Sequence, residues 1–382
     1  MVIHCHHSFN PVSGEMKRII NIDNDVVGFF DEGIIELEFY SIRNYLFVKN
    51  KGRFVLSNRV IKKYYVPNVP RLGVINSFFR FFVILYLFFR YKPSLFLEEW
   101  SLPKGIKLLK YLFKKCKIGL DIHGAAPEEF YYLHKKPSRM LIRQERYSVF
   151  AADFIICQSD EMRRHLEHKY GITEGITVYR CGVDINIFKV DSVLRSTVRD
   201  SLGVSDDDLV FVYSGGMHSW QKVYDSAQIF VKYHSLNEHS VFLILTKEVS
   251  LCKRILFEAG GDSLLNSSFI VSLPFDEVPK YLNAADVAFL IRDDDIMNAV
   301  ASPTKLAEYF ACGLPIISSR VSKKWISGEG QRFVFDADNL NYACLFESIH
   351  CINKQQISDF SSKELSLEID RENVQQFLSS YL

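Results

Sequence analysis

Ala301-Ser-Pro-Thr-Lys-Leu-Ala-Glu-Tyr-Phe-Ala-Cys-Gly-Leu-Pro-Ile-Ile-Ser-Ser319 is the stretch that decides how the second half of this chain folds. It predicts a loop, a short helix and a buried strand. We expect the hydroxyl of Ser302 to cap the helix and Pro303 to occupy the first helical position, where its missing N–H costs nothing. Gly313 suits the left-handed residue that follows a helix, and Pro315 prevents the helix from continuing.

The first turn of this helix predicts an anion site. The open amides of Thr304 and Lys305 point out of the N-terminus, where the helix dipole favours phosphate. Glu308 lies on the same face, roughly 6 Å further along the axis. That separation matches the span from a diphosphate to the ribose of the same nucleotide, whose hydroxyls a carboxylate can bind. The alternative is a well-capped surface helix with a solvated glutamate.

The sequence Ser-Pro-Thr-Lys-Leu at 302–306 resembles the donor-binding signature of family-four retaining glycosyltransferases of the GT-B type, in particular their bacterial polysaccharide branch. The resemblance implies that Glu308 contacts the donor ribose and that Ser302, Pro303 and the amides that follow lie against the diphosphate. Many members carry a second glutamate eight positions earlier. This chain has Val300 there, so the pair of glutamates is incomplete.

Composition limits the class of protein. A length of 382 residues suggests two domains, and a hydrophobic content of 48% supports well-packed cores. A net charge of +1 gives no reason to expect a nucleic-acid partner. The eight cysteines are scattered without metal-ligand spacing, and the N-terminus lacks a signal-peptide pattern. These features predict a reduced, cytoplasmic protein.

Strands alternate with helices along the chain, which predicts parallel sheets covered on both faces, with ligands at the carboxyl ends of the strands. The resemblance implies an α/β fold of the GT-B type, with two Rossmann-like domains whose sheets face a central cleft. We place the acceptor-side domain at 1–188 and the nucleotide-sugar domain at 189–365, and we expect a helix at 366–382 to cross back to the first domain. Within 34–66, Asn50-Lys-Gly52 predicts a hairpin turn.

His123 follows a predicted strand in the first domain. Asp121-Ile-His-Gly, followed by Pro-Glu-Glu at 127–129, resembles the family's cleft segment, in which the matching histidine contacts the donor sugar beside the reacting carbon. Asp121 points to the same face of the strand and either orients the His123 ring or is buried for folding. Ser13 and Gly14 stand where the family has a glycine-rich turn near the donor phosphate or the acceptor, with a plain turn as the alternative.

An apolar strand at 209–213 runs into a double-glycine turn, where backbone can approach phosphate closely. The family usually carries an Arg and a Lys in this loop. Here the register puts Gly216 and Gln221 at those positions. The resemblance implies donor contacts from Gly215, Gly216, Trp220, Gln221 and Lys222.

Compensating charge must then come from elsewhere. Arg292, at the carboxyl end of a predicted strand, can fork onto two phosphate oxygens, and Lys305 can assist. The alternative is an ion pair between Arg292 and the acidic run 293–295. Leu273 to Phe275 resembles the loop whose backbone reads the edge of the nucleotide base.

Phe78 to Phe89 is apolar on nearly all helical faces, yet it is shorter than the roughly 20 residues of a spanning helix. Arg80 interrupts it. One interpretation is a helix buried over the sheet, and the other is a helix that presses aromatic side chains and Arg80 into a membrane interface. Nearby basic residues are Arg59, Lys62, Lys63 and Arg71.

The resemblance implies a retaining hexosyltransferase that moves a sugar from a UDP- or GDP-sugar to a glycan or polyprenyl-diphosphate-linked acceptor in bacterial surface polysaccharide synthesis. It implies no metal and no cofactor, because helix dipoles and cations hold the leaving diphosphate. A peripheral position at the inner face of the cytoplasmic membrane follows from such an acceptor. The alternatives are a nucleotide-sugar epimerase of the same form and an inactive, transferase-derived binding subunit.

Overall fold

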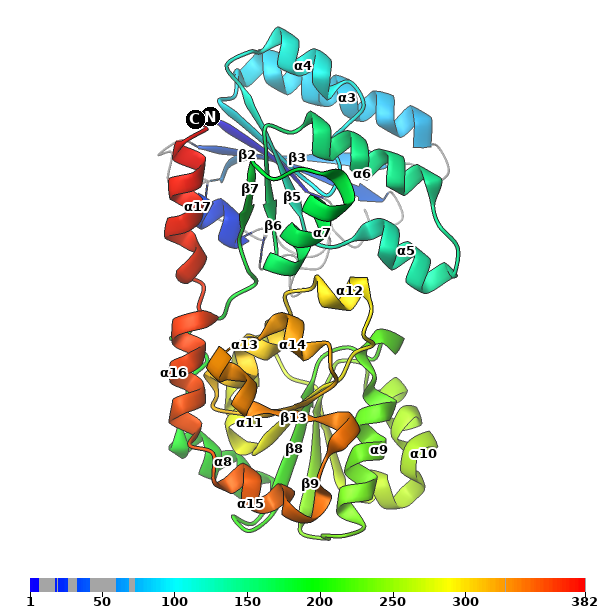
Figure 1. Cartoon of the computed structure of the whole chain (residues 1–382), viewed down its shortest axis with the longest axis vertical. Coiled ribbons are helices and arrows are strands. Elements are labelled where there is room, and N and C mark those ends of the chain that lie inside the picture. Colours follow the sequence, from blue (N-terminus) through cyan, green and yellow to red (C-terminus); the bar gives the residue numbers. More distant parts are fainter. Residues whose placement is uncertain are drawn as a thin grey trace. The chain divides into compact units, whose positions relative to one another are not determined.

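The computed structural model describes nearly all of the chain after residue 72 and separate segments before it, namely 1–6, 18, 20–26, 33–41, 60–68, 73–326 and 328–381. The chain forms two compact units, and in each a parallel sheet is flanked by helices (Figure 1). Unit 1 comprises residues 1–181, 300–302 and 370–382, and unit 2 comprises residues 182–299 and 303–369. The predicted α/β class with two parallel sheets is confirmed.

Unit 1 is built on a seven-stranded sheet in the order β3-β2-β1-β4-β5-β6-β7, in which every pair of neighbours is parallel. Buried apolar side chains dominate its central strands, as expected for a sheet covered on both faces. The strands are Val2–His6 (β1), Ile34–Ser41 (β2), Val60–Asn68 (β3), Leu95–Glu99 (β4), Lys117–Ile122 (β5), Phe154–Cys157 (β6) and Ile176–Val178 (β7).

Helices from both ends of the chain cover the unit 1 sheet. The helix α17 packs Val374 and Leu378 into one core with Phe154, and its Asp370 lies 2.6 Å from Arg180. The described helices are Ile22–Val26 (η1), Gly73–Tyr91 (α3), Ile106–Leu112 (α4), Ala126–His134 (α5), Arg139–Ala151 (α6), Asp160–Tyr170 (α7) and Ile369–Ser379 (α17).

The predicted hairpin around Asn50-Lys51-Gly52 is wrong. Strands β2 and β3 pair in parallel, with Leu37 opposite Tyr64, whereas a tight turn joins antiparallel strands. Parallel neighbours need a long crossover, and β2 and β3 are separated in the chain by residues 42–59. These residues, the three turn residues among them, lie outside the described residues.

Unit 2 carries a six-stranded parallel sheet in the order β10-β9-β8-β11-β12-β13. Its strands are Leu209–Ser214 (β8), Ser240–Leu245 (β9), Ser268–Val271 (β10), Val287–Leu290 (β11), Ile316–Ser318 (β12) and Val334–Asp336 (β13). Its described α-helices are Ser192–Leu202 (α8), Val223–His234 (α9), Val249–Asn266 (α10), Val278–Ala284 (α11), Ile296–Ala299 (α12), Thr304–Ala311 (α13), Ser322–Trp325 (α14), Leu345–His350 (α15) and Lys354–Glu364 (α16).

One buried carboxylate ties the helices of unit 2 to its sheet. Asp286, just before β11, lies 2.7 Å from Arg195 and 3.3 Å from Arg199, both on α8, and accepts a hydrogen bond from the amide of Val210 at 2.8 Å. Burial raises the pKa of Asp286, but Lys354 and the two arginines outweigh burial and lower it. This carboxylate therefore stays ionised in the folded chain.

Replacing Asp286 with asparagine should destabilise the protein by about 3–5 kcal/mol, because two arginines would remain beside it without a charged partner. Urea unfolding at neutral pH measures this change in the free energy of unfolding. Asp262→Asn, which alters an exposed carboxylate on α10, serves as the control and should change little. Equal stabilities of the two variants would contradict the role given to Asp286.

Candidate functional site

Helix α13 begins at Thr304, and Pro303 occupies the N-cap position with extended backbone angles. The prediction that Ser302 caps this helix is wrong, because its hydroxyl accepts a hydrogen bond from the amide of Cys181 at 3.0 Å. Among the described residues no side chain caps α13, so no side-chain cap occupies the amides of its first turn. Gly313 adopts φ 72° just past the helix, as the sequence predicts.

Two cations meet beside this helix. Lys305 Nζ donates to Gln221 Oε1 at 2.7 Å, and Arg292 Nη2 donates to the same oxygen at 2.5 Å. Lys305 also donates to the hydroxyl of Tyr213 at 3.0 Å. Burial lowers the pKa of Lys305 well below its usual range, and the charge of Arg292 lowers it further, whereas Glu308 opposes the shift. An anion bound here would relieve the repulsion between the two cations.

Gly215 makes this arrangement possible. It follows β8 with φ 140°, and a Cβ at this position would lie 2.3 Å from Lys305 Nζ. A side chain would therefore displace the lysine. The hydroxyl of Tyr309 accepts a hydrogen bond from the amide of Ser214 at 2.9 Å, which fixes α13 against the end of β8.

The rest of the predicted loop is engaged elsewhere. The amide of Met217, which follows Gly216, donates to Glu248 at 2.7 Å. Lys222 lies 2.9 Å from Asp293, which raises the pKa of Lys222. The ring of Trp220 stacks on His218 with a centroid distance of 4.4 Å. None of these three contacts involves Gln221 Oε1.

Other predicted donor residues lie in packed positions. Glu308 is only 8% exposed on α13. Phe275 begins a short 3-10 helix, and the centroid of its ring lies 5.5 Å from that of Phe188. Leu273 packs against the hydrophobic core of unit 2 that contains Phe188. Val300, where many family members carry a glutamate, is 3% exposed within the main core of unit 1.

The predicted residues of the first domain form a separate cluster in unit 1. Asp121, at the end of β5, contacts His123 Nε2. Its carboxylate also accepts two hydrogen bonds from Arg18, from Nη2 at 2.6 Å and from Nε at 3.3 Å. Asp121 therefore both orients His123 and balances a buried charge. Ser13 and Gly14 lie outside the described residues.

Charges set the protonation of this cluster. Burial lowers the pKa of His123, but Asp121 and Glu99 outweigh burial and raise it. Glu99, the last residue of β4, lies 3.9 Å from the ring. Burial also lowers the pKa of His4, but Asp23 and Glu99 raise it to about 9. Protonated His123 can donate a hydrogen bond to a sugar oxygen and is poorly suited to act as a base.

The sequence did not single out Arg18 or Glu99, because neither stands in a recognisable motif and their partners are distant in the chain. Arg18 binds a residue 103 positions away.

Among the described residues, no group of three His, Cys, Asp or Glu side chains could hold a metal ion.

Replacing Asp121 with asparagine should destabilise the protein by about 3–5 kcal/mol, because Arg18 would stay buried without its partner. Burial raises the pKa of Asp121, yet Arg18 and His123 hold it well below its usual range. The wild-type advantage should therefore be full above the unfolded pKa of about 3.9 and shrink at lower pH. Urea unfolding across pH, with Glu372→Gln on the exposed face of α17 as control, measures this. A pH-independent difference would contradict it.

This chain matches a family model in sequence and known proteins in structure. Residues 42–187 match the family model of Glycosyltransferase Family 4. No curated protein matches the chain. Among solved structures, Anabaena Alr3699/HepE in complex with UDP and glucose has a TM-score of 0.70 at 15% identity, with 99% of both chains covered.

Two further structures share this fold. WaaG, a glycosyltransferase involved in lipopolysaccharide biosynthesis, has a TM-score of 0.59 at 11% identity, with 100% of this chain and 95% of that chain covered. The lipopolysaccharide outer core galactosyltransferase WaaB has a TM-score of 0.64 at 13% identity, with 100% and 99% covered. The predicted resemblance to family-four glycosyltransferases is confirmed by the match at residues 42–187, and the predicted GT-B fold is confirmed over the whole chain.

Proposed function

We propose that this chain is a family-four glycosyltransferase of the GT-B type. It would transfer a hexose, with retention of anomeric configuration, from a nucleotide-diphosphate sugar to a glycan or lipid-linked acceptor in bacterial surface polysaccharide synthesis. The observation that carries the proposal is the pair of cations, Arg292 and Lys305, that share one neutral oxygen beside the start of α13. The solved structures of Alr3699/HepE with UDP and with UDP-glucose favour uridine as the base.

The diphosphate is proposed to bind where Arg292 and Lys305 converge. Gln221 stands where the family register has a lysine. Its side-chain oxygen instead accepts hydrogen bonds from Arg292, which follows β11, and from Lys305 of α13. A bound diphosphate supplies the negative charge that this cluster accommodates, and the amides of Thr304 and Lys305 add the helix dipole. Glu308, on the same helix, is proposed to accept from the ribose hydroxyls.

The chemistry requires stabilisation of a leaving group more than a protein nucleophile. The acceptor oxygen bonds to the anomeric carbon as the bond from that carbon to the phosphate oxygen breaks. The acceptor proton passes to the departing phosphate, which leaves a glycoside and a nucleoside diphosphate. Arg292 and Lys305 hold the charge that develops, and protonated His123 is proposed to hold a sugar oxygen.

The donor site is tested by thermal unfolding with UDP, GDP and uridine, without added metal. A diphosphate at about 100 times its Kd should add about 2.7 kcal/mol to the free energy of unfolding, and uridine should add much less. Lys305→Met should weaken diphosphate binding at least about tenfold, because a charge-assisted hydrogen bond is lost. Lys253→Met, on the exposed face of α10, is the matched control.

The charge of Lys305 provides a second measurement. A bound diphosphate should raise its lowered pKa, so binding should take up a proton and weaken as pH rises. Calorimetry in two buffers at pH about 8, above the second phosphate ionisation near 6, measures this uptake. Uptake should vanish in Lys305→Met. Diphosphate binding that is equal in wild type and Lys305→Met would contradict the assignment.

An inactive, transferase-derived binding subunit is the competing function, and buried Val300 is the observation that favours it. Both functions predict binding of a nucleotide diphosphate. They differ in turnover, because only a transferase consumes the donor sugar when an acceptor is present. Release of UDP from UDP-glucose in the presence of a lipid-linked glycan therefore separates them.

Helix α3 carries an outward apolar face that supports a membrane-bound acceptor. Its inner face buries Ile84, Leu87 and Phe88, and its Arg80 turns inward to contact Glu98. The outer face exposes large apolar side chains, from 49% for Phe79 to 63% for Phe78. These outer residues are Ile75, Phe78, Phe79, Phe82, Tyr86 and Phe89. The inner face fits the interpretation of a helix buried over the sheet, and the exposed outer face supports the proposal of a membrane-facing helix.

The neighbouring helix α4 extends this surface. It lies beside α3 (Figure 1), with the rings of Phe89 and Phe113 5.1 Å apart, and it exposes Leu108, Tyr111 and Leu112. Between residues 73 and 117 the sequence carries nine Lys and Arg residues and two acidic residues, both buried. None of the helices in the described part of the chain has the length and hydropathy to span a bilayer. We propose that this face lies in an anionic membrane interface.

Sedimentation with phosphatidylglycerol vesicles tests the membrane face. The wild type should bind, and added salt should weaken binding because surface charge is screened. Phe82→Ser combined with Tyr86→Ser should lower the partition coefficient at least about tenfold, since two apolar side chains no longer enter the interface. Phe257→Ser, an exposed aromatic on α10, is the control. Equal sedimentation of the double variant and the wild type would contradict the proposal.

A further inference from the structure

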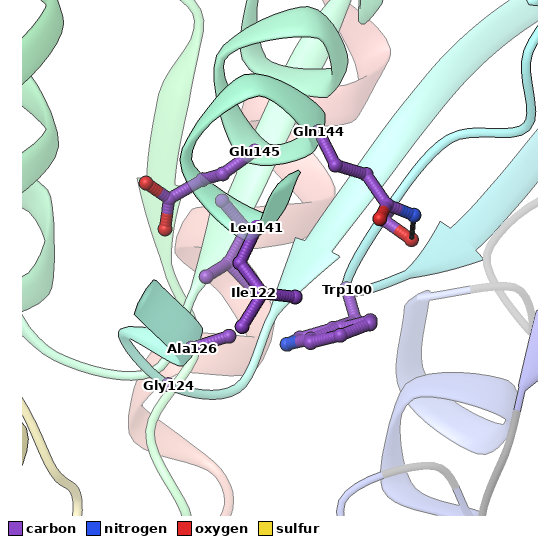
Figure 2. Close-up of a pocket in the computed structure, with 8 residues that line it drawn as sticks. Trp100, Ile122, Gly124, Ala126, Leu141, Gln144 and Glu145 are labelled. Atoms are coloured by element: carbon purple, nitrogen blue, oxygen red, sulfur yellow. Dashed lines mark hydrogen bonds between the residues drawn. The ribbon is translucent and has the colours of Figure 1, made fainter. Parts of the chain in front are cut away.

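A hollow in unit 1 lies beside the end of β5 and was not anticipated from the sequence. It has about 290 Å³ of open space, and the indole of Trp100 forms one wall. Figure 2 shows Ile122 and Leu141 opposite this ring, with Gln144 beside it. Much of this space is open to solvent and the enclosed part is small, so a ligand ring would rest against the exposed indole at the mouth of the hollow.

Trp100 holds an unusual backbone conformation. Its φ is 65°, in the left-handed region, and its side chain stays 41% exposed. The turn is fixed on both sides, because the Trp100 amide donates to the carbonyl of Asp121 at 2.8 Å and the Ser101 amide donates to the carbonyl of Glu99 at 2.6 Å. A bulky residue in this region costs of order 1–3 kcal/mol, and glycine would avoid most of that cost. The turn alone does not explain an indole at this position.

The polar groups of the hollow suit a neutral ligand. Gln144 donates from its amide nitrogen to the hydroxyl of Ser101 at 2.8 Å, and the amide also has an acceptor oxygen. The carboxylate of Glu145 turns away from Trp100 (Figure 2) and lies 2.5 Å from Lys169. The hollow therefore combines an aromatic face, an apolar wall and neutral hydrogen-bonding groups.

This combination matches a sugar ring. The C–H bonds on one face of a pyranose carry partial positive charge and meet the negative face of an indole, while its hydroxyls need neutral donors and acceptors. A cation would lack a carboxylate aimed at it, and a phosphate would lack a cation. We infer that the hollow at Trp100 binds one pyranose ring of the acceptor glycan.

The position of the hollow supports an acceptor role. Two of its lining residues, Ile122 and Gly124, flank His123 in the chain, so the same segment forms the hollow and carries the proposed sugar-binding histidine. On its other side, the carbonyl of Ser101 accepts from Arg80 of α3 at 3.3 Å. The hollow is thus attached to the helix proposed to lie on the membrane. The inference rests on the proposed transferase function.

The test uses the full chain and three probes, the methyl glycosides of glucose, galactose and mannose. Saturation-transfer NMR should detect contact with the ring protons of at least one glycoside, and saturating UDP should not displace it. Trp100→Gly keeps the left-handed turn without strain and removes the indole, so the fold should be at least as stable while glycoside binding falls about tenfold. Trp100→Phe keeps an aromatic ring and should retain most of the signal.

Three results would overturn the inference: no contact with any glycoside, contact that UDP abolishes, or equal contact in wild type and Trp100→Gly. The UDP-induced thermal shift is measured in the same samples. If UDP still stabilises the protein while glycoside contact is absent, the subsite is wrong and the donor site stands. If UDP fails to stabilise while the glycosides bind at Trp100, the transferase proposal is the one that fails.

Discussion

Parallel strand pairing is the constraint on which the rest of this structure depends. Parallel neighbours cannot be joined by tight turns, so each strand is followed by a crossover, and all the strands of a sheet end at one edge. Beyond that edge the backbone no longer makes the hydrogen bonds of the sheet, so the residues there are available for other contacts. In unit 1 it gathers Glu99 and Asp121, and in unit 2 it gathers Gly215 and Arg292. The chemistry of both clusters follows from this geometry.

Charge in the unit 2 cluster comes from elements other than the loop in which the family usually carries it. Gln221 accepts hydrogen bonds from a strand-end arginine and a helix lysine, so a neutral residue gathers two cations at one point. Gly215 permits the lysine to lie against the backbone. A cluster of this kind is costly without an anion, because burial and mutual repulsion disfavour the second charge. We propose that the same cost becomes affinity when a diphosphate supplies the missing charge.

The helix α3 has one apolar face that is buried against the sheet and one apolar face that is exposed. Its inner face packs on the sheet through Ile84 and Leu87, and Arg80 reaches the buried Glu98. Burial raises the pKa of Glu98, and although Arg80 opposes that shift the pKa reaches about 7. The single charged residue in the middle of the Phe-rich run therefore faces inward, as does Phe88, whereas Phe78, Phe79, Phe82 and Phe89 face outward. An ordinary surface helix turns its charged residues outward and its apolar residues inward, whereas α3 turns Arg80 inward and exposes apolar residues as well.

The sequence by itself determined the order of strands and helices and the end of α13 at Gly313, because these depend on local periodicity and backbone preference. The anion-binding turn at the start of α13 stays a prediction. The sequence also identified Arg292 and Lys305 as candidates. Only the tertiary structure decided which groups they meet.

Contacts between distant residues account for what the sequence left open. Ser302 binds Cys181 and does not cap its own helix. Arg18 pairs with Asp121, and Trp100 opens a hollow with residues of β5 and α6. Such pairs join residues from 22 to 121 positions apart in the chain. No local pattern marks them, because their energy comes from burial and charge that exist only once the sheet has brought the segments together.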